Sequence, residues 1–381
     1  MTSQPRGARV STIELFFDLV FVFTVTQFAS LLVQHLDLLH TARVLLMLGI
    51  IWWMYSGYAW LTNAVAPSST LRRTLLLTGM AGFLLIALAI PEAFGAGGWV
   101  FGAGYLLVTV VHTTLFLHAD DNISIRTAVF QLAPFNGAAA VLVLAGGLLP
   151  GAWRYGLWAL ALALVIAAPY LQRGMGHWTI DAGHFAERHG LVIIVAIGES
   201  VVAVGLAFAD LKLTVTNVAV GILGLCIAYY LYWNYFSGDE TRAEHALAAL
   251  RDPARKARVA VLAWGYAHYL LIAGIVFVAV GVKLAVAHST EASHWPAAIA
   301  LSAGAAAFLL GHAWFLQILS IRGAAFRVAA AAGVLAVIPL GHWLAVAQLV
   351  AVLLIMATAV IARDQRTIRR EHSTAIHDFG R

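Results

Sequence analysis

The sequence predicts an all-α integral membrane protein. Of its 381 residues, 62% are hydrophobic and only 11% are charged, whereas soluble domains carry about 25% charged residues. The chain also contains 12 Trp residues, a residue type that gathers at membrane interfaces. So few charges could not cover the surface of a soluble protein of this length. The composition therefore excludes soluble enzymes, nucleic-acid-binding proteins and secreted domains held together by disulfides.

Apolar stretches long enough to cross a membrane follow one another along the chain. A bilayer core is spanned by roughly 20 helical residues. We expect about 12 spans, at residues 12–34, 43–63, 74–92, 98–118, 127–148, 153–171, 188–208, 214–236, 257–284, 296–320, 325–340 and 342–362. The eleventh is short and rich in Gly and Ala, so residues 325–362 are also compatible with a re-entrant pair.

Loop charges predict the orientation of these spans. If the N-terminus is inside, 19 Lys and Arg residues lie on that side and 4 lie on the other. Because positive charge favours cytoplasmic loops, we expect both termini in the cytoplasm and a multi-pass location in the bacterial inner membrane. The net charge of +5 is spread over these loops, so no nucleic-acid partner is expected. The single cysteine, Cys226, allows no intrachain disulfide.

An internal repeat is expected on either side of a cytoplasmic linker. Aligning Glu14 with Glu187 brings similar polar residues together, and His112 and His312 occupy corresponding helices. An even number of helices in each repeat makes the two repeats parallel. The expected parts are a first six-helix repeat (1–171), a linker (172–187), a second six-helix repeat (188–362) with a cytoplasmic loop (238–256), and a basic cytoplasmic tail (363–381).

Ionisable residues inside the spans are the candidate functional groups, because a charge in hydrocarbon costs at least about 2.5–3.5 kcal/mol. Glu14 and Asp18 are four residues apart and share one helix face. Two carboxylates there repel each other, so either one is protonated or an Arg or His lies opposite. The alternative is a structural role, either as a cap at the membrane interface or in a salt bridge to Arg9, Arg126 or Arg188.

The seventh span carries a second polar group. Glu187 and His189 lie where it enters the membrane, and Glu199 and Ser200 lie near the midplane, where an unpaired carboxylate is unstable. The alternative is a neutral Glu199 that forms a hydrogen bond between helices. The residues expected to couple an ion or proton, or to bind substrate, are Glu14, Asp18, Glu187, His189, Glu199 and Ser200.

Further polar residues predict a hydrated vestibule. Its expected lining residues are Gln27, His112, Gln131, Asn136, His268 and His312. Each histidine is equally compatible with simple packing. The spacing of His, Glu and Asp within the spans matches no metal site, so we expect no metal, no cofactor and no catalytic residue.

Two sequence strings carry a family resemblance. They are Glu14-Leu-Phe-Phe-Asp18-Leu-Val-Phe-Val-Phe and His184-Phe-Ala-Glu187-Arg188-His189-Gly-Leu-x-Ile-Ile-x-Ala-x-Gly198-Glu199-Ser200. Together they resemble the bacterial low temperature requirement protein A (LtrA) family, and the resemblance in length and span layout covers nearly the whole chain. It implies an inner-membrane protein linked to growth in the cold, in a family without an established molecular activity.

A more distant resemblance concerns the first helix. Phe16-Phe17-Asp18-x-Val20-Phe21 is similar to the Phe-Ser-Asp motif of lysosomal and bacterial potassium channels built from six-helix repeats. Those channels also keep both termini in the cytoplasm. Here Phe17 replaces the serine, and the seventh span has no Phe-x-Asp motif.

These observations favour an ion- or proton-coupled transporter with the intramembrane carboxylates as coupling groups. The alternatives are a cation channel, or a non-transporting membrane enzyme or cold-growth envelope factor. The expected partners are the lipid bilayer and an unidentified ion or small molecule, and a homodimer is compatible with the sequence.

Overall fold

The computed structural model describes residues 10–64, 69–118, 123–171, 180–208, 211–288 and 291–379, without the side chains of 123–129 and 363–379. Every regular element in these ranges is helical. Twelve helical segments within them are long and apolar enough to cross a membrane, which confirms the predicted class and the approximate number of spans. A helix satisfies its own backbone hydrogen bonds, so it is stable where no water is present.

The chain forms two compact units, which we describe separately. The first comprises residues 1–199 and 240–269, and the second comprises residues 200–239 and 270–381. This division by packing does not follow the expected repeats at 1–171 and 188–362. The repeat, which concerns sequence and helix order, stays a prediction.

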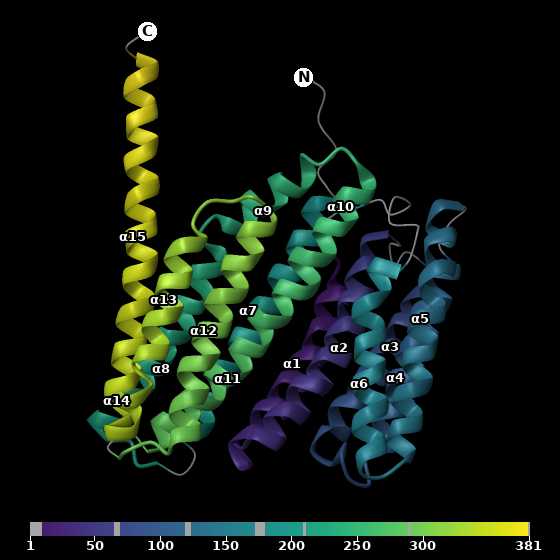
Figure 1. The fold of residues 1–381 in the computed structure, drawn as a ribbon, viewed down its shortest axis with the longest axis horizontal. Coiled ribbons are helices and arrows are strands. Elements are labelled where there is room, and N and C mark those ends of the chain that lie inside the picture. The colour runs from purple at the N-terminus through teal and green to yellow at the C-terminus, as the bar shows by residue number, and fades with distance from the viewer. Residues whose placement is uncertain are drawn as a thin grey trace. The chain divides into compact units, whose positions relative to one another are not determined.

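The first unit contains most of the N-terminal helices (Figure 1). Its elements are α1 (Thr12–Gln34), α2 (Leu38–Ala64), α3 (Thr70–Ala89), η1 (Ile90–Glu92), α4 (Gly98–Leu117), α5 (Ile123–Leu148), α6 (Ala152–Leu171), most of α7 (Ala182–Ala207), α9 (Asp239–Ala248), α10 (Pro253–Ala260) and the π-helix η3 (Val261–Ala267). Helix α3 packs against α4, α4 against α5, and α5 against α6. Helix α2 packs on both α4 and α6.

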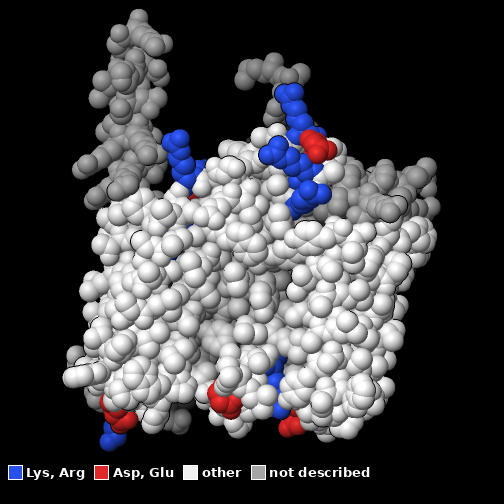
Figure 2. Space-filling model, viewed as in Figure 1, with Lys and Arg blue, Asp and Glu red and all other residues white. Residues whose placement is uncertain are grey.

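The second unit contains α8 (Val215–Phe236), most of α11 (His268–Ala287), α12 (Trp295–Ile318), α13 (Ala324–Ala336), α14 (Ile338–Trp343) and α15 (Ala345–Phe379). Helix α15 packs on α8 and α13, and α12 packs on α13. Figure 2 shows that the visible helix flanks carry hardly any Lys, Arg, Asp or Glu, and that such side chains gather at the helix ends. Apolar flanks of this kind suit contact with lipid.

Two predicted boundaries were wrong. Helix α7 begins at Ala182 instead of residue 188, because the Asp181 carboxylate accepts hydrogen bonds from the backbone N–H groups of Gly183 and His184 and caps the helix. The end of the predicted linker is therefore helical, whereas residues 172–179 lie outside the described ranges. The mixed charges of the predicted cytoplasmic loop 238–256 indicate a surface helix, and this segment does contain α9 and the start of α10.

The second difference concerns the C-terminal spans. The predicted span 325–340 is divided at Val337 into α13 and α14, and Pro339 lies in the first turn of α14, a position that suits proline. Helix α15 extends beyond the predicted span 342–362 and continues through most of the predicted tail. The segment Ala324–Trp343 is still long enough to cross a membrane.

Each unit contains a helix pair that crosses at two glycines. A Cβ added to Gly82 of α3 would lie 3.3 Å from the Gly104 carbonyl oxygen of α4, and one added to Gly274 of α11 would lie 2.7 Å from the Gly304 carbonyl oxygen of α12. Such small residues let helix backbones approach closely in a membrane.

Candidate functional site

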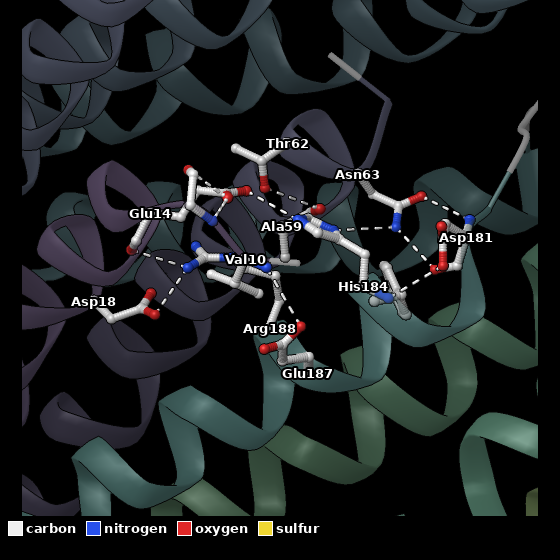
Figure 3. Close-up of polar contacts among 12 residues, drawn as sticks. Val10, Glu14, Asp18, Ala59, Thr62, Asn63, Asp181, His184, Glu187 and Arg188 are labelled. Carbon is white, nitrogen blue, oxygen red and sulfur yellow. Dashed lines mark hydrogen bonds and ion pairs between the residues drawn. The ribbon is translucent and has the colours of Figure 1, made fainter. Parts of the chain in front are cut away.

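Five buried polar side chains of the first unit form the feature that we call the carboxylate cluster: Glu14, Asp18, Tyr55, His184 and Arg188. They come from three helices, α1, α2 and α7. Residues four apart lie on one face of a helix, so α1 presents its two carboxylates to the histidine and arginine of α7. Figure 3 shows Arg188 reaching both Glu14 and Asp18.

Asp18 forms the deeper half of the cluster. Arg188 Nη1 lies 2.8 Å from Asp18 Oδ2, and the Tyr55 hydroxyl donates a hydrogen bond of 2.5 Å to Asp18 Oδ1. Arg188 Nη1 also donates to the Glu14 backbone carbonyl at 2.9 Å. The aspartate and arginine side chains are each only 1% exposed. The prediction that a cation faces the helix-1 carboxylates is therefore confirmed for Asp18.

Glu14 forms the half nearer the start of α1. Its Oε2 accepts hydrogen bonds from the Ser11 backbone N–H at 2.7 Å and from the Ser11 hydroxyl at 2.6 Å. Its Oε1 lies 3.2 Å from His184 Nε2. The other ring nitrogen of His184 lies 3.4 Å from the Asn63 amide nitrogen, and Asn63 also donates to the Asp181 carbonyl. If the Asn63 amide donates to Nδ1, the histidine carries its proton on Nε2, directed at Glu14.

The structural alternative for these carboxylates, a cap or a salt bridge to a nearby arginine, agrees with the contacts seen. Glu14 caps α1, since it binds the Ser11 N–H group at the helix start. Asp18 is paired with Arg188, one of the three arginines considered, and this pair is buried. The other cations considered, Arg9 and the Arg126 side chain, lie outside the described residues.

Arg188 retains unused hydrogen-bonding capacity. Its Nε and Nη2 atoms are buried and have no hydrogen-bond partner among the described residues. A guanidinium normally uses these two groups together to bind a carboxylate in a bidentate manner. The paired Asp18 is reached only through Nη1, so one edge of the guanidinium is available for another arrangement.

A histidine pair lies next to the cluster, beside the π-helix. His189 of α7 and His268 at the start of α11 have ring centroids 5.6 Å apart. His268 Nδ1 lies 2.9 Å from the Ala263 carbonyl oxygen inside η3, and Trp52 Nε1 donates to the Gly265 carbonyl at 2.7 Å. π-helical turns are rare and are often found at functional sites.

Glu199 and Glu187 have contrasting environments. Glu199 is 2% exposed, and its Oε2 accepts a 2.5 Å hydrogen bond from the Thr26 hydroxyl of α1. A hydrogen bond between helices was the predicted alternative to a coupling role for Glu199, and the bond to Thr26 is of this kind. Glu187 instead is exposed, and its Oε2 accepts a hydrogen bond from the Val10 backbone N–H at 3.3 Å. Ser200 is buried, and its hydroxyl has no partner among the described residues.

The residues predicted to line one vestibule lie in several places. His112 and Asn136 line a cavity within the first unit. Gln27 and Gln131 are half-buried and are not among its described lining residues. His268 lies against His189, as described above. The sixth residue, His312, belongs to the second unit.

The second unit has its own buried ion pair, which the sequence did not predict. Arg327 Nη2 donates to Asp239 Oδ2 and to the Asn234 carbonyl, and Arg327 Nε donates to His312 Nδ1 at 3.1 Å. Asp239 lies in the predicted loop 238–256, and Arg327 lies near the start of the predicted span 325–340. Their positions beside apolar helices are the one signal that could have indicated burial.

Sequence reasoning also missed three residues of the carboxylate cluster as site residues. Tyr55 is not among the predicted site residues, Arg188 is named only as a salt-bridge partner, and His184 only as part of a family string. The i, i+4 spacing of His184 and Arg188, which repeats that of Glu14 and Asp18, is the signal that could have paired the two helices.

The fold and these clusters define a multi-pass α-helical membrane protein with ion pairs buried inside its helix bundles. The family described as bacterial low temperature requirement A protein (LtrA) matches residues 9–362. The chain therefore belongs to this family, as its two strings indicated. It is also 28% identical over 327 residues to an uncharacterized protein of Rhizobium meliloti (strain 1021), a match that covers 81% of this chain and 77% of the relative.

Proposed function

We propose that this protein is a proton-coupled transporter of the bacterial inner membrane, with both termini in the cytoplasm and the carboxylate cluster as its proton-handling site. The observation that carries the proposal is the pairing of Asp18 with Arg188 and Tyr55 at 1% exposure inside a helix bundle. Ionisable groups at such positions in membrane proteins commonly belong to proton or ion pathways.

The chemistry of the cluster suits a proton acceptor. While Asp18 is ionised, it compensates the charge of Arg188 and holds α1 against α7. Protonation of Asp18 removes that compensation, and an uncompensated buried charge is strongly destabilising. Arg188 must then find another partner, for which its Nε and Nη2 groups are available. A proton on Asp18 thus favours a different arrangement of the two helices, as coupling requires.

Glu14 and His184 supply a route for the proton. They form a carboxylate–imidazole pair one helical turn from Asp18, nearer the start of α1. An imidazole can accept a proton on one ring nitrogen and release it from the other. The Glu14 carbonyl and Asp18 share the same Arg188 nitrogen, so a change of charge at one carboxylate affects the other through a single side chain.

The test is solute-dependent proton movement in liposomes. The full chain is reconstituted with a pH-sensitive dye inside and with the membrane potential clamped, and neutral, cationic and anionic small solutes are added in turn. At least one solute should elicit proton movement with the wild type. Asp18→Asn should abolish it, whereas Glu291→Gln, which neutralises an exposed carboxylate in the second unit, should retain it.

Two outcomes would contradict the proposal. Proton movement in Asp18→Asn equal to that of the wild type, at matched protein levels, would remove the cluster from the mechanism. Steady, solute-independent current under voltage would instead indicate a channel.

A further inference from the structure

A partly open cavity of about 60 Å³ lies within the first unit and is not part of the carboxylate cluster. It is formed by α2, α4, α5, α6 and η3. Two prolines occur along its helices, Pro134 within α5 and Pro169 within α6, and the π-helix η3 supplies Val261 and Gly265. Interrupted helices in membrane proteins often border binding sites, because the irregular backbone must line a cavity.

The walls of this cavity are aromatic. Trp53 and Trp60 of α2 and Phe116 of α4 line it, with the aliphatic side chain of Leu132 on α5. None of its described lining residues is Asp, Glu, Lys or Arg. A charged ligand would therefore lose its hydration without gaining a counter-ion, which is costly.

Two buried polar side chains in the wall have hydrogen-bonding capacity left over. Asn136, 3% exposed, accepts a weak hydrogen bond from Trp53 Nε1 at 3.4 Å, and its amide donates none among the described residues. His112, also 3% exposed, has a buried Nε2 atom without a partner among those residues. Few polar groups in an apolar wall are typical of small-molecule sites, where they fix the orientation of the ligand.

We infer that this cavity binds a small, uncharged, ring-containing molecule with one polar group that hydrogen-bonds to the Asn136 and His112 side of the wall. Aromatic side chains favour stacked or edge-on contact with such a ring. The identification of this molecule as the transported solute depends on the function proposed above. The claim that the cavity binds it depends only on the residues that line the cavity.

The cavity and the carboxylate cluster share one helix, α2. Tyr55, which binds Asp18, is followed in α2 by Ser56, which lines the cavity. Trp60 of α2 lines the cavity and contacts the ring of Phe185 on α7 at a centroid distance of 5.2 Å. A ligand that displaces α2 would therefore also move Tyr55 of the cluster.

Four probes with the same ring separate the ligand classes: benzyl alcohol (uncharged, polar), benzylamine (cationic), benzoate (anionic) and toluene (no polar group). Binding to the full chain in lipid nanodiscs is titrated calorimetrically, with empty nanodiscs as the blank. Benzyl alcohol should bind saturably at one site, about tenfold more tightly than the two ions or toluene, since one well-placed hydrogen bond contributes up to roughly that factor.

Substitutions in the cavity wall test whether benzyl alcohol binds in this cavity. Leu132→Trp places a larger side chain in the cavity wall and should abolish saturable binding of benzyl alcohol. The matched control Leu160→Trp, at a position of α6 that is 53% exposed, should not. Asn136→Leu should reduce the preference for benzyl alcohol over toluene to about twofold or less while the cavity stays open.

Several outcomes would overturn the inference. They are the absence of saturable binding, equal or tighter binding of benzylamine or benzoate, unchanged binding in Leu132→Trp, and an equal affinity for toluene that Asn136→Leu does not alter. The last outcome would indicate that the cavity binds an apolar lipid chain.

The binding test and the transport test can fail independently. Binding is measured without a pH gradient, so it does not require proton movement. If the wild type binds benzyl alcohol but moves no protons in liposomes, the proposed transport is wrong and the binding site remains. If protons move with another solute while benzyl alcohol does not bind, the cavity assignment alone is wrong.

Discussion

Removal of one member of the Asp18–Arg188 pair should destabilise the protein far more than removal of both. Asp18→Leu leaves Arg188 with only the Glu14 carbonyl as a partner, and Arg188→Met leaves Asp18 with only the Tyr55 hydroxyl. Both side chains are 1% exposed. The loss of one partner from a buried pair costs about 3–5 kcal/mol in the free energy of unfolding, whereas replacement of both by apolar residues is often neutral.

A double-mutant cycle measures this coupling. The four proteins are unfolded by denaturant in one fixed detergent, and unfolding is followed by circular dichroism. We expect each single variant to lose about 3–5 kcal/mol, and the double variant to recover most of that loss. Glu291→Gln, which neutralises an exposed carboxylate of the second unit, should leave the unfolding free energy unchanged within error.

Additive losses in the double variant would refute this reasoning, because the two charges would then not stabilise each other. Single losses as small as those of the exposed control would show that water reaches the pair.

Three further predictions use other parts of the chain. Gly274→Ala should destabilise the protein, because the added Cβ would lie 2.6 Å from a backbone nitrogen of α12. At Gly156 an added Cβ meets nothing within 4 Å, so Gly156→Ala should instead stabilise the protein by about 1 kcal/mol. The same unfolding assay compares the two variants. Tyr55→Phe should cost about 1.5–3 kcal/mol in that assay, since it removes the 2.5 Å hydrogen bond to the Asp18 carboxylate, and a loss below measurement error would mean that the bond does not stabilise the fold. A reporter fused after the C-terminus should lie in the cytoplasm, and a reporter inserted near Ala96 should lie outside. Protease protection would show both positions. A C-terminus outside the cytoplasm would contradict the predicted orientation.

The membrane class and most of the spans could be predicted because they depend on local composition. Hydrocarbon requires a continuous apolar stretch of a certain length, and a helix satisfies its backbone hydrogen bonds within that stretch. The shared face of Glu14 and Asp18 also follows from helical periodicity alone. The errors in α7 and α13 arose where a local polar contact or a proline, and not hydropathy, sets the helix end.

The partners of the buried charges could not be predicted in this way. The sequence required a counter-charge for Asp18 and offered several cations, but only the packing of α7 on α1 selects Arg188 and places His184 at Glu14. The same holds for Arg327, which lies near the start of the predicted span 325–340 and which the second unit buries against Asp239. Periodicity fixes which side chains share a face of one helix, whereas the contacts between faces depend on how the helices rotate and tilt against one another. That choice is made by side-chain packing across the whole unit.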